Sequence, residues 1–227
     1  MAKKKKNQQP TDEPIALDVQ LSKGEAFIEK NWKTIAAVLG AIIVIVVGVY
    51  LYKNHMADKE LQAQKAIASA QVAFAQQQYE QALKGDGNSK GLLKVIDEFG
   101  GTETANIAKL YAGLAYANTD KVDEAIKYLE NFSAQDDDIV SPAAIAALGN
   151  LYIQKGDNEK GVKTLVKAAE KADNDAVSPV FLLQAGQVYE SMGQNDKALD
   201  LYNKIKKQYF RSPLSQEIDK YIERATK

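Results

Sequence analysis

Residues 34–52, TIAAVLGAIIVIVVGVYLY, are all uncharged and lie between Lys33 and Lys53. At about 1.5 Å per residue, a helix of this length covers roughly 28 Å, close to the hydrocarbon thickness of a bilayer. Trp32, Tyr50 and Tyr52 stand where interfacial aromatic residues are common. A buried core helix is rarely apolar on every side, and a cleaved signal peptide needs a shorter apolar region before a small-residue site. We therefore expect one transmembrane helix that is retained.

The distribution of lysines predicts how this helix is oriented. The N-terminal tail, residues 1–33, carries seven lysines, including the run Lys3 to Lys6. Short flanking segments rich in Lys stay in the cytoplasm, although such a run can also be a solvated tail without further meaning. In a bacterium this predicts a single-pass inner-membrane protein with residues 1–33 in the cytoplasm and residues 53–227 in the periplasm.

Composition argues against several classes of function. The chain has a net charge of −1, and no basic patch with interleaved aromatics indicates nucleic-acid binding. Cysteine is absent, and the single histidine, His55, has no ligand-like neighbours. The run Asp86-Gly87-Asn88 lacks the later acidic ligands of a calcium loop and is expected to be a turn. With no phosphate loop or nucleophile motif, we expect no enzyme, no cofactor and no metal site.

After residue 53 the apolar spacing is helical and no convincing strand appears. Residues 57–84 contain no Pro or Gly before the turn that follows and are expected to continue as one helix. Ser-Pro pairs at 141–142, 178–179 and 212–213 are each expected to start a helix, with Ser as the N-cap and Pro in the first turn.

Three segments share one pattern between these pairs: residues 112–129, 148–165 and 185–202. Each has a glycine, a tyrosine three residues later and a small residue nine residues after the tyrosine. The matching residues are Gly113, Tyr116 and Ala125; Gly149, Tyr152 and Gly161; and Gly186, Tyr189 and Ala198. Glycine inside a helix is costly unless another helix comes close. We therefore expect the glycine to meet the small residue of an antiparallel helix, and the tyrosine to fill the joint to the next pair.

This pattern resembles the tetratricopeptide repeat, which has a period near 34 residues. The resemblance implies an all-α solenoid of helix pairs, because one pair cannot bury its own apolar side. We expect about three clear repeats from residue 105, a divergent first unit at 57–104 with YEQAL (79–83) starting its second helix, and a capping helix at 212–227.

In tetratricopeptide proteins, the first helix of each pair lines a concave binding groove. The resemblance places these candidate groove residues there: Ile107, Leu110, Leu114, Ala117, Ala143, Ala146, Asn150, Ile153, Val180, Leu183 and Gln187. A carboxylate clamp is not expected, because apolar residues stand where the family uses lysine. An apolar groove suits an amphipathic helix or an unfolded segment. The alternative is that helix 57–84 fills the groove from within.

The layout of a Lys-rich tail, one anchor and a repeat domain resembles the YfgM-like family of ancillary translocon subunits, and the segment YEQALKGDGN (79–88) looks like the membrane-anchored repeat proteins of Bacteroidetes-type bacteria. The resemblance implies an adaptor beside the SecYEG channel that works with a periplasmic chaperone. An envelope-assembly or cell-division scaffold is the alternative. Self-association is also possible through Ala36-x-x-x-Gly40 and Ala37-x-x-x-Ala41 in the anchor.

Overall fold

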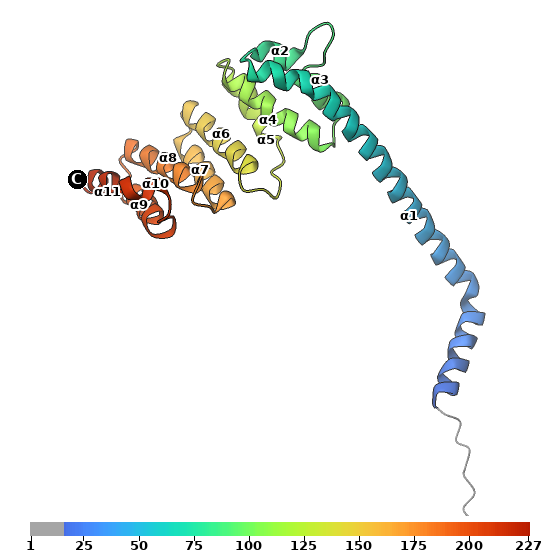
Figure 1. Cartoon of the computed structure of the whole chain (residues 1–227). Coiled ribbons are helices and arrows are strands. Elements are labelled where there is room, and N and C mark those ends of the chain that lie inside the picture. Colours follow the sequence, from blue (N-terminus) through green and yellow to red (C-terminus); the bar gives the residue numbers. More distant parts are fainter. Residues whose placement is uncertain (1–15) are drawn as a thin grey trace, which may run out of the picture. The chain divides into compact units, whose positions relative to one another are not determined.

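The computed structural model describes residues 16–227, with side chains from Glu25 onward, and within this part the chain forms helices and no strands (Figure 1). It divides into two compact units between His55 and Met56, which are described separately. The helices are α1 (Ala16–Ala75), α2 (Tyr79–Lys84), α3 (Leu92–Glu98), α4 (Glu103–Ala117), α5 (Val122–Glu130), α6 (Val140–Gln154), α7 (Asn158–Ala172), α8 (Ser178–Ser191), α9 (Asn195–Gln208), α10 (Pro213–Glu217) and α11 (Asp219–Ala225).

The N-terminal unit is built from the first part of α1, up to His55. Within Glu25–Ala75, an 18-residue window has a mean hydropathy of 2.7 and none of it is buried. Large apolar side chains such as Val44, 71% exposed, face outward on all sides. A helix of this length and composition can cross a membrane, as an anchor or as a signal segment. Residues 1–15 of the predicted cytoplasmic tail lie outside the described residues.

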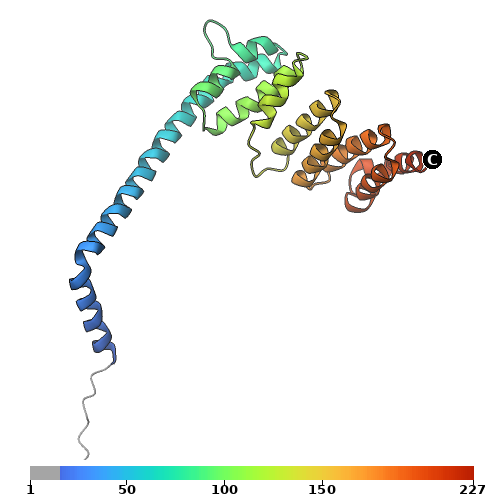
Figure 2. The same ribbon diagram turned by 180° about the vertical axis from the view of Figure 1, so that it is seen from behind.

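The C-terminal unit contains three consecutive helix pairs: α4 with α5, α6 with α7 and α8 with α9 (Figures 1 and 2). The second helices α5 and α7 also contact the first helix of the following pair, α6 and α8 respectively. The buried residues therefore form several successive clusters rather than one central core. This arrangement is an α-solenoid, in which each pair is stabilised by its neighbours, and it confirms the predicted fold class.

The segment before these three pairs is not the single helix predicted over 57–84, but a second helix begins at YEQAL (79–83), as the repeat pattern predicts. The helix α1 ends at Ala75 because Gln77 adopts a left-handed conformation with φ of 61°, and α2 begins at Tyr79. The ring of Tyr79 packs edge-on against Phe74, with centroids 5.5 Å apart. Residues 56–75 and α2 are therefore two arms of a turn, joined without Gly or Pro.

A short loop, residues 85–91, separates α2 from α3. A Cβ atom on Gly91 would lie 2.3 Å from the Gly85 nitrogen, so the two ends of the loop touch and only glycine fits there. Inside the loop, the Asp86 carboxylate accepts hydrogen bonds from the backbone N–H groups of Asn88 (2.9 Å) and Ser89 (2.7 Å). Asp86 is thus occupied in holding a turn, which is the role that the sequence predicts for this segment.

Ser141 and Ser178 are not the N-caps that the sequence predicts. Both are fully buried, and their hydroxyls accept hydrogen bonds from the N–H groups of Gln135 (2.7 Å) and Asn174 (3.0 Å) in the preceding loops. At α6 a loop residue supplies the cap instead, because the Asp137 carboxylate accepts from the N–H groups of Ile139, Val140 and Ser141. Before α8 the Asn174 side chain accepts from the N–H groups of Ala176 and Val177, which belong to the turn that leads into the helix.

The third Ser-Pro pair behaves as predicted. The Ser212 hydroxyl caps α10 and accepts a hydrogen bond from Leu214 N–H at 3.3 Å. The predicted single capping helix over 212–227 is divided at Ile218 into α10 and α11. Ile218 is fully buried among residues of α8 and α9, so both short helices cover the end of the last pair.

The glycines of the repeat pattern lie where the two helices of each pair come close together. A Cβ on Gly149 would lie 3.0 Å from the carbonyl oxygen of Gly161, and one on Gly113 would lie 2.6 Å from Leu129 Cγ. A Cβ on Gly186 would lie 2.3 Å from the Tyr202 ring. The small partners Ala125 and Ala198 are fully buried.

The tyrosines of the pattern lie at joints between pairs. Tyr116 stacks on Tyr128 of its own pair, with centroids 5.4 Å apart. Tyr152 donates a hydrogen bond from its hydroxyl to Glu130, which belongs to the preceding pair rather than the next one. Tyr189 is half-buried between the two last pairs. The expectation that the tyrosine joins its pair to the following one is therefore wrong for Tyr152.

Candidate protein-interaction surface

The first helices of the pairs carry one repeated set of outward side chains, which we call the A-helix face. Six of these residues occur at matched positions in α4, α6 and α8: Ile107, Ala143 and Val180 in the first turns, and Leu114, Asn150 and Gln187 two turns later. Ala143, Asn150, Val180 and Gln187 are exposed, whereas Ile107 and Leu114 are half-buried. Ile153 and Leu183, also half-buried, complete the A-helix face. A partner can therefore reach a mixture of aliphatic groups and carboxamides.

Three residues expected in the groove lie deeper than the sequence suggests. Leu110 is only 9% exposed and packs in a cluster with Ala144 and Leu151. Ala146 is buried against α7 and α8, and Ala117 is half-buried at the end of α4. Because neighbouring first helices pack against one another at this position, Leu110 contributes to the core and is not available to a partner.

Charge is distributed very unevenly between the two layers of helices. The first helix α6 contains no charged residue, and α8 contains only Glu190. Glu190 forms an ion pair with Arg224 and accepts a hydrogen bond from the Tyr202 hydroxyl. The second helices α7 and α9 contain six charged residues each. Charged side chains normally cover exposed helix faces, so the uncharged A-helix face indicates a surface suited to contact with an apolar or uncharged partner.

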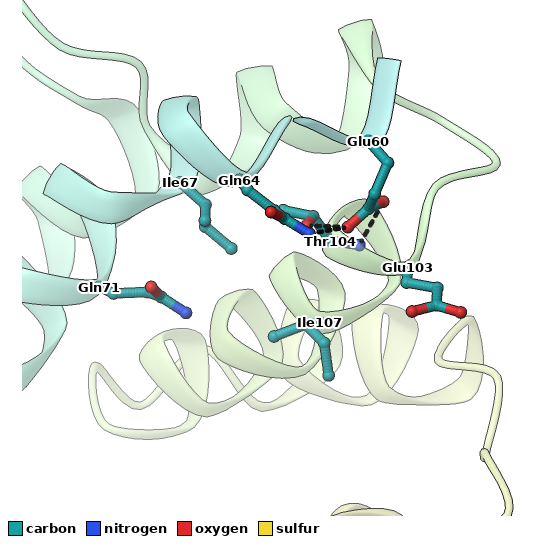
Figure 3. Close-up of a pocket in the computed structure, with 7 residues that line it drawn as sticks. All are labelled: Glu60, Gln64, Ile67, Gln71, Glu103, Thr104 and Ile107. Atoms are coloured by element: carbon teal, nitrogen blue, oxygen red, sulfur yellow. Dashed lines mark hydrogen bonds between the residues drawn. The ribbon is translucent and has the colours of Figure 1, made fainter. Parts of the chain in front are cut away.

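A cavity of ≈ 320 Å³ lies at the start of the domain, between α1 and α4 (Figure 3). Its lining consists of Glu60, Gln64, Ile67, Gln71, Glu103, Thr104 and Ile107. The two helices run side by side in the same direction here, since Glu60 bonds Thr104 and Phe74 packs on Tyr111 with ring centroids 5.0 Å apart. Ile107 connects the cavity with the rest of the A-helix face.

Glu60 is fixed at the rim of this cavity. Its carboxylate accepts hydrogen bonds from the Thr104 hydroxyl (2.6 Å), the Thr104 N–H (3.2 Å) and the Gln64 amide (3.0 Å). Burial opposes ionisation, but these hydrogen bonds outweigh it and lower the pKa of Glu60 below its usual value. Glu60 is therefore a carboxylate that is ionised and held in place at neutral pH.

The end of α1 does not fill the A-helix face from within. Its buried residues Ala63, Ile67, Ala70 and Ala73 form a cluster with residues of α2, α3 and α4. The alternative that helix 57–84 covers the groove is therefore wrong, and residues 56–75 instead serve as the first helix of an additional pair.

The sequence analysis placed residues 57–104 in a divergent first unit but assigned no residue of α1 to the A-helix face, although one signal was present. In the clear repeats the small residue follows the glycine by twelve positions, as Ala125 follows Gly113. Ala70 lies twelve residues before Ala82 and therefore takes the position of the glycine. Gln64 lies six residues before Ala70, as Ile107 lies six residues before Gly113, so Gln64 and Ile107 are at matched positions. The repeat pattern is hard to detect in α1 because alanines, Ala70 and Ala73, stand at the glycine and tyrosine positions.

No cluster of acidic, histidine or cysteine side chains suited to a metal occurs among residues that the structure describes, and His55 is exposed. What the surface offers is shape, aliphatic contacts and carboxamide hydrogen bonds. These are the means by which helical repeats bind polypeptide segments.

Comparison with known proteins shows the family and the fold of this chain. The model of a family described as "Tetratricopeptide repeat-like domain" matches residues 25–209, whereas no curated protein matches the chain. The fold is similar to that of a crystal structure from Podosopora anserina, described as "putative kinesin light chain nearly identical TPR-like repeats". The TM-score is 0.56 at 14% identity, and the match covers 72% of this chain and 85% of that chain. A single-residue variant of the same Podosopora anserina protein gives a TM-score of 0.54 at 15% identity, covering 72% of this chain and 84% of that one. MamA is 20% identical over 69% of this chain and 92% of its own, with a TM-score of 0.48. The chain belongs to the tetratricopeptide repeat-like domain family.

Proposed function

We propose that this protein is a membrane-anchored adaptor that binds an apolar or uncharged polypeptide segment of a partner on the A-helix face. The anchor is the apolar part of α1, and the binding surface is carried by α1, α4, α6 and α8. Family membership supports protein binding in general terms, because proteins of this repeat family serve as interaction scaffolds.

The observation that carries the proposal is the contrast in charge between the two helix layers. The first helices α6 and α8 carry no free charge, since their one acid, Glu190, is ion-paired. A surface that only contacts water has no need to exclude charged residues in this way. Burial of apolar area against a partner gives about 25 cal/mol per Å², and each charged group on the surface would oppose that burial. Asn150 and Gln187 supply hydrogen bonds to a partner backbone without adding charge.

We further propose that the domain lies in the periplasm of a bacterium and meets its partners at the Sec translocon, with a periplasmic chaperone. The layout of tail, anchor and repeat domain supports this, as does the lysine-rich N-terminal tail. In this setting the A-helix face would meet polypeptide segments that have not yet buried their apolar residues.

The test is site-specific photo-crosslinking of the full-length protein in intact membranes. A photoreactive residue replaces Asn150 on the A-helix face, and the control replaces Lys163, which is exposed on α7. We expect Asn150 to crosslink to translocon subunits, chaperone or secreted chains, and Lys163 to give much weaker products.

Products at Asn150 that consist of division or outer-membrane assembly factors would replace the translocon assignment with a scaffold role. Equal crosslinking from Asn150 and Lys163 would contradict the A-helix face as the binding surface.

A further inference from the structure

The cavity between α1 and α4 differs in character from the rest of the A-helix face. Its aliphatic lining is Ile107 on α4 and the nearly buried Ile67 on α1, and Gln64 and Gln71 stand beside Ile67 on the α1 side (Figure 3). Two carboxylates, Glu60 and Glu103, lie at its rim. The A-helix face is therefore uncharged over α6 and α8 and acidic at the end formed by α1 and α4.

The two carboxylates differ in how they are held. Glu60 is oriented by Thr104 and Gln64, while Glu103 is exposed in the first turn of α4. Among the described residues neither forms an ion pair, although other acids at repeat joints do: Glu130 pairs with Lys160 and Glu190 with Arg224. The cavity therefore has a negative rim without its own counter-charge.

We propose that this cavity receives a lysine or arginine side chain of the bound polypeptide, and so sets the direction in which that polypeptide lies along the A-helix face. The aliphatic stem of such a side chain would lie over the half-buried Ile107, and its charged head would reach the Glu60 carboxylate, with Glu103 adding negative charge at the same rim. The carboxamides of Gln64 and Gln71 can bond the neighbouring backbone. This inference rests on the proposed function, and it specifies that the bound segment carries a basic residue that the cavity recognises.

Charge complementarity favours this occupant over the others. An acidic residue would be repelled by Glu60, whose pKa is lowered so that it remains ionised at neutral pH. An apolar residue would contact the aliphatic lining but leave the carboxylates without a partner. A basic side chain with an aliphatic stem satisfies both parts of the cavity.

The experiment uses the full-length protein in nanodiscs and three peptides that carry an uncharged dye. The peptides share one uncharged sequence of Ala, Leu, Ser and Gly and differ at a single position near one end, which is Lys, Gln or Glu. Fluorescence anisotropy measures each dissociation constant. We expect the Lys peptide to bind about threefold to tenfold more tightly than the Gln peptide, as for an exposed ion pair, and the Glu peptide to bind more weakly.

The double substitution Glu60→Gln and Glu103→Gln should remove the preference for Lys while the Gln peptide still binds. Gln at position 60 can still accept the hydrogen bond from Thr104, and an unchanged melting temperature verifies the fold. The matched control is Glu124→Gln, an exposed acid on α5, which should leave the preference intact.

Equal binding of the Lys and Gln peptides by the unaltered protein would overturn the basic-residue cavity while leaving the proposed function in place. A preference for Lys that survives the double substitution would also overturn it. Failure of all three peptides to bind would instead count against the A-helix face as a peptide-binding surface.

Discussion

The carbonyl oxygen of Gly161 lies 3.0 Å from the place that a Cβ atom on Gly149 would occupy. This contact joins α6 to α7 at the middle of the domain, and the atom in the way belongs to the backbone, which cannot rotate aside.

Replacing Gly149 by Leu should therefore force the two helices apart and lower the stability of the domain by about 1–3 kcal/mol. Thermal unfolding followed by circular dichroism measures the change. Gly87→Leu is the control, because nothing lies within 4 Å of a Cβ at Gly87. An unchanged melting temperature for the Gly149 variant would contradict the close packing of this pair.

Asp137→Ala should remove the cap of α6 and cost about 1 kcal/mol, which corresponds to a fall of about 2–4 °C in the melting temperature. Asp136→Ala, a change at the adjacent and fully exposed carboxylate, is the matched control and should have no comparable effect.

The contribution of Asp137 should also depend on pH. Burial opposes its ionisation, but hydrogen bonds from Ser141, Ile139 and Val140 prevail and lower the pKa to about 2 from 3.8. A carboxyl group whose pKa is lower in the folded state than in the unfolded state stabilises the fold at pH values above its unfolded-state pKa. That contribution is lost as the pH falls through its folded-state pKa. The difference in stability between the unaltered protein and Asp137→Ala should thus be full above about pH 4 and shrink towards pH 2. A difference that stays constant over this range would show that the charge plays no part.

Removal of residues 1–53 should yield a soluble helical protein, because the exposed apolar surface of the N-terminal unit is then gone. The full-length chain should sediment with membranes and require detergent for extraction. Its recovery in the soluble fraction without detergent would contradict the anchor.

A reporter that is active only outside the cytoplasm should be active when fused after Lys227. The reason is the excess of lysine in the N-terminal tail, which favours retention of that tail in the cytoplasm. Activity of a cytoplasm-specific reporter at the same position would reverse the orientation.

Val180→Glu and Leu110→Glu should have different consequences. Val180 is 38% exposed on the A-helix face, so a carboxylate there should weaken crosslinking of apolar segments while the melting temperature stays near that of the unaltered protein. Leu110 is buried, so a carboxylate there should unfold or strongly destabilise the domain. Normal crosslinking by a folded Val180→Glu variant would place the partner elsewhere.

The sequence predicts the stacked pairs well because their signals are local. Gly149 and Gly161, or Gly186 and Ala198, lie twelve residues apart, and a short turn brings them together. At the end of α1 the sequence supports two incompatible predictions, one helix over 57–84 and a second helix starting at YEQAL (79–83), since Gln76, Gln77 and Gln78 carry no turn signal. There the left-handed residue is imposed by packing, with Phe74 held between Tyr79 and Tyr111.

The caps and the cavity depend on interactions over longer distances. Ser141 and Ser178 have the local chemistry of N-caps, but the loops before them fold over their hydroxyls; Asp137 caps α6, and Asn174 holds the turn before α8. Glu60 and Thr104 are 44 positions apart and meet only because α1 runs beside α4. No periodicity within either helix indicates that contact, so the cavity emerges only from the tertiary structure.

The touching ends of the loop at residues 85–91 make it suitable for protein engineering. Because Gly85 and Gly91 close the loop at its base, the separation between α2 and α3 is fixed independently of the number of residues at its tip. A fluorescent protein or an epitope tag can therefore be inserted at Gly87, which is exposed, to follow the chain in living cells.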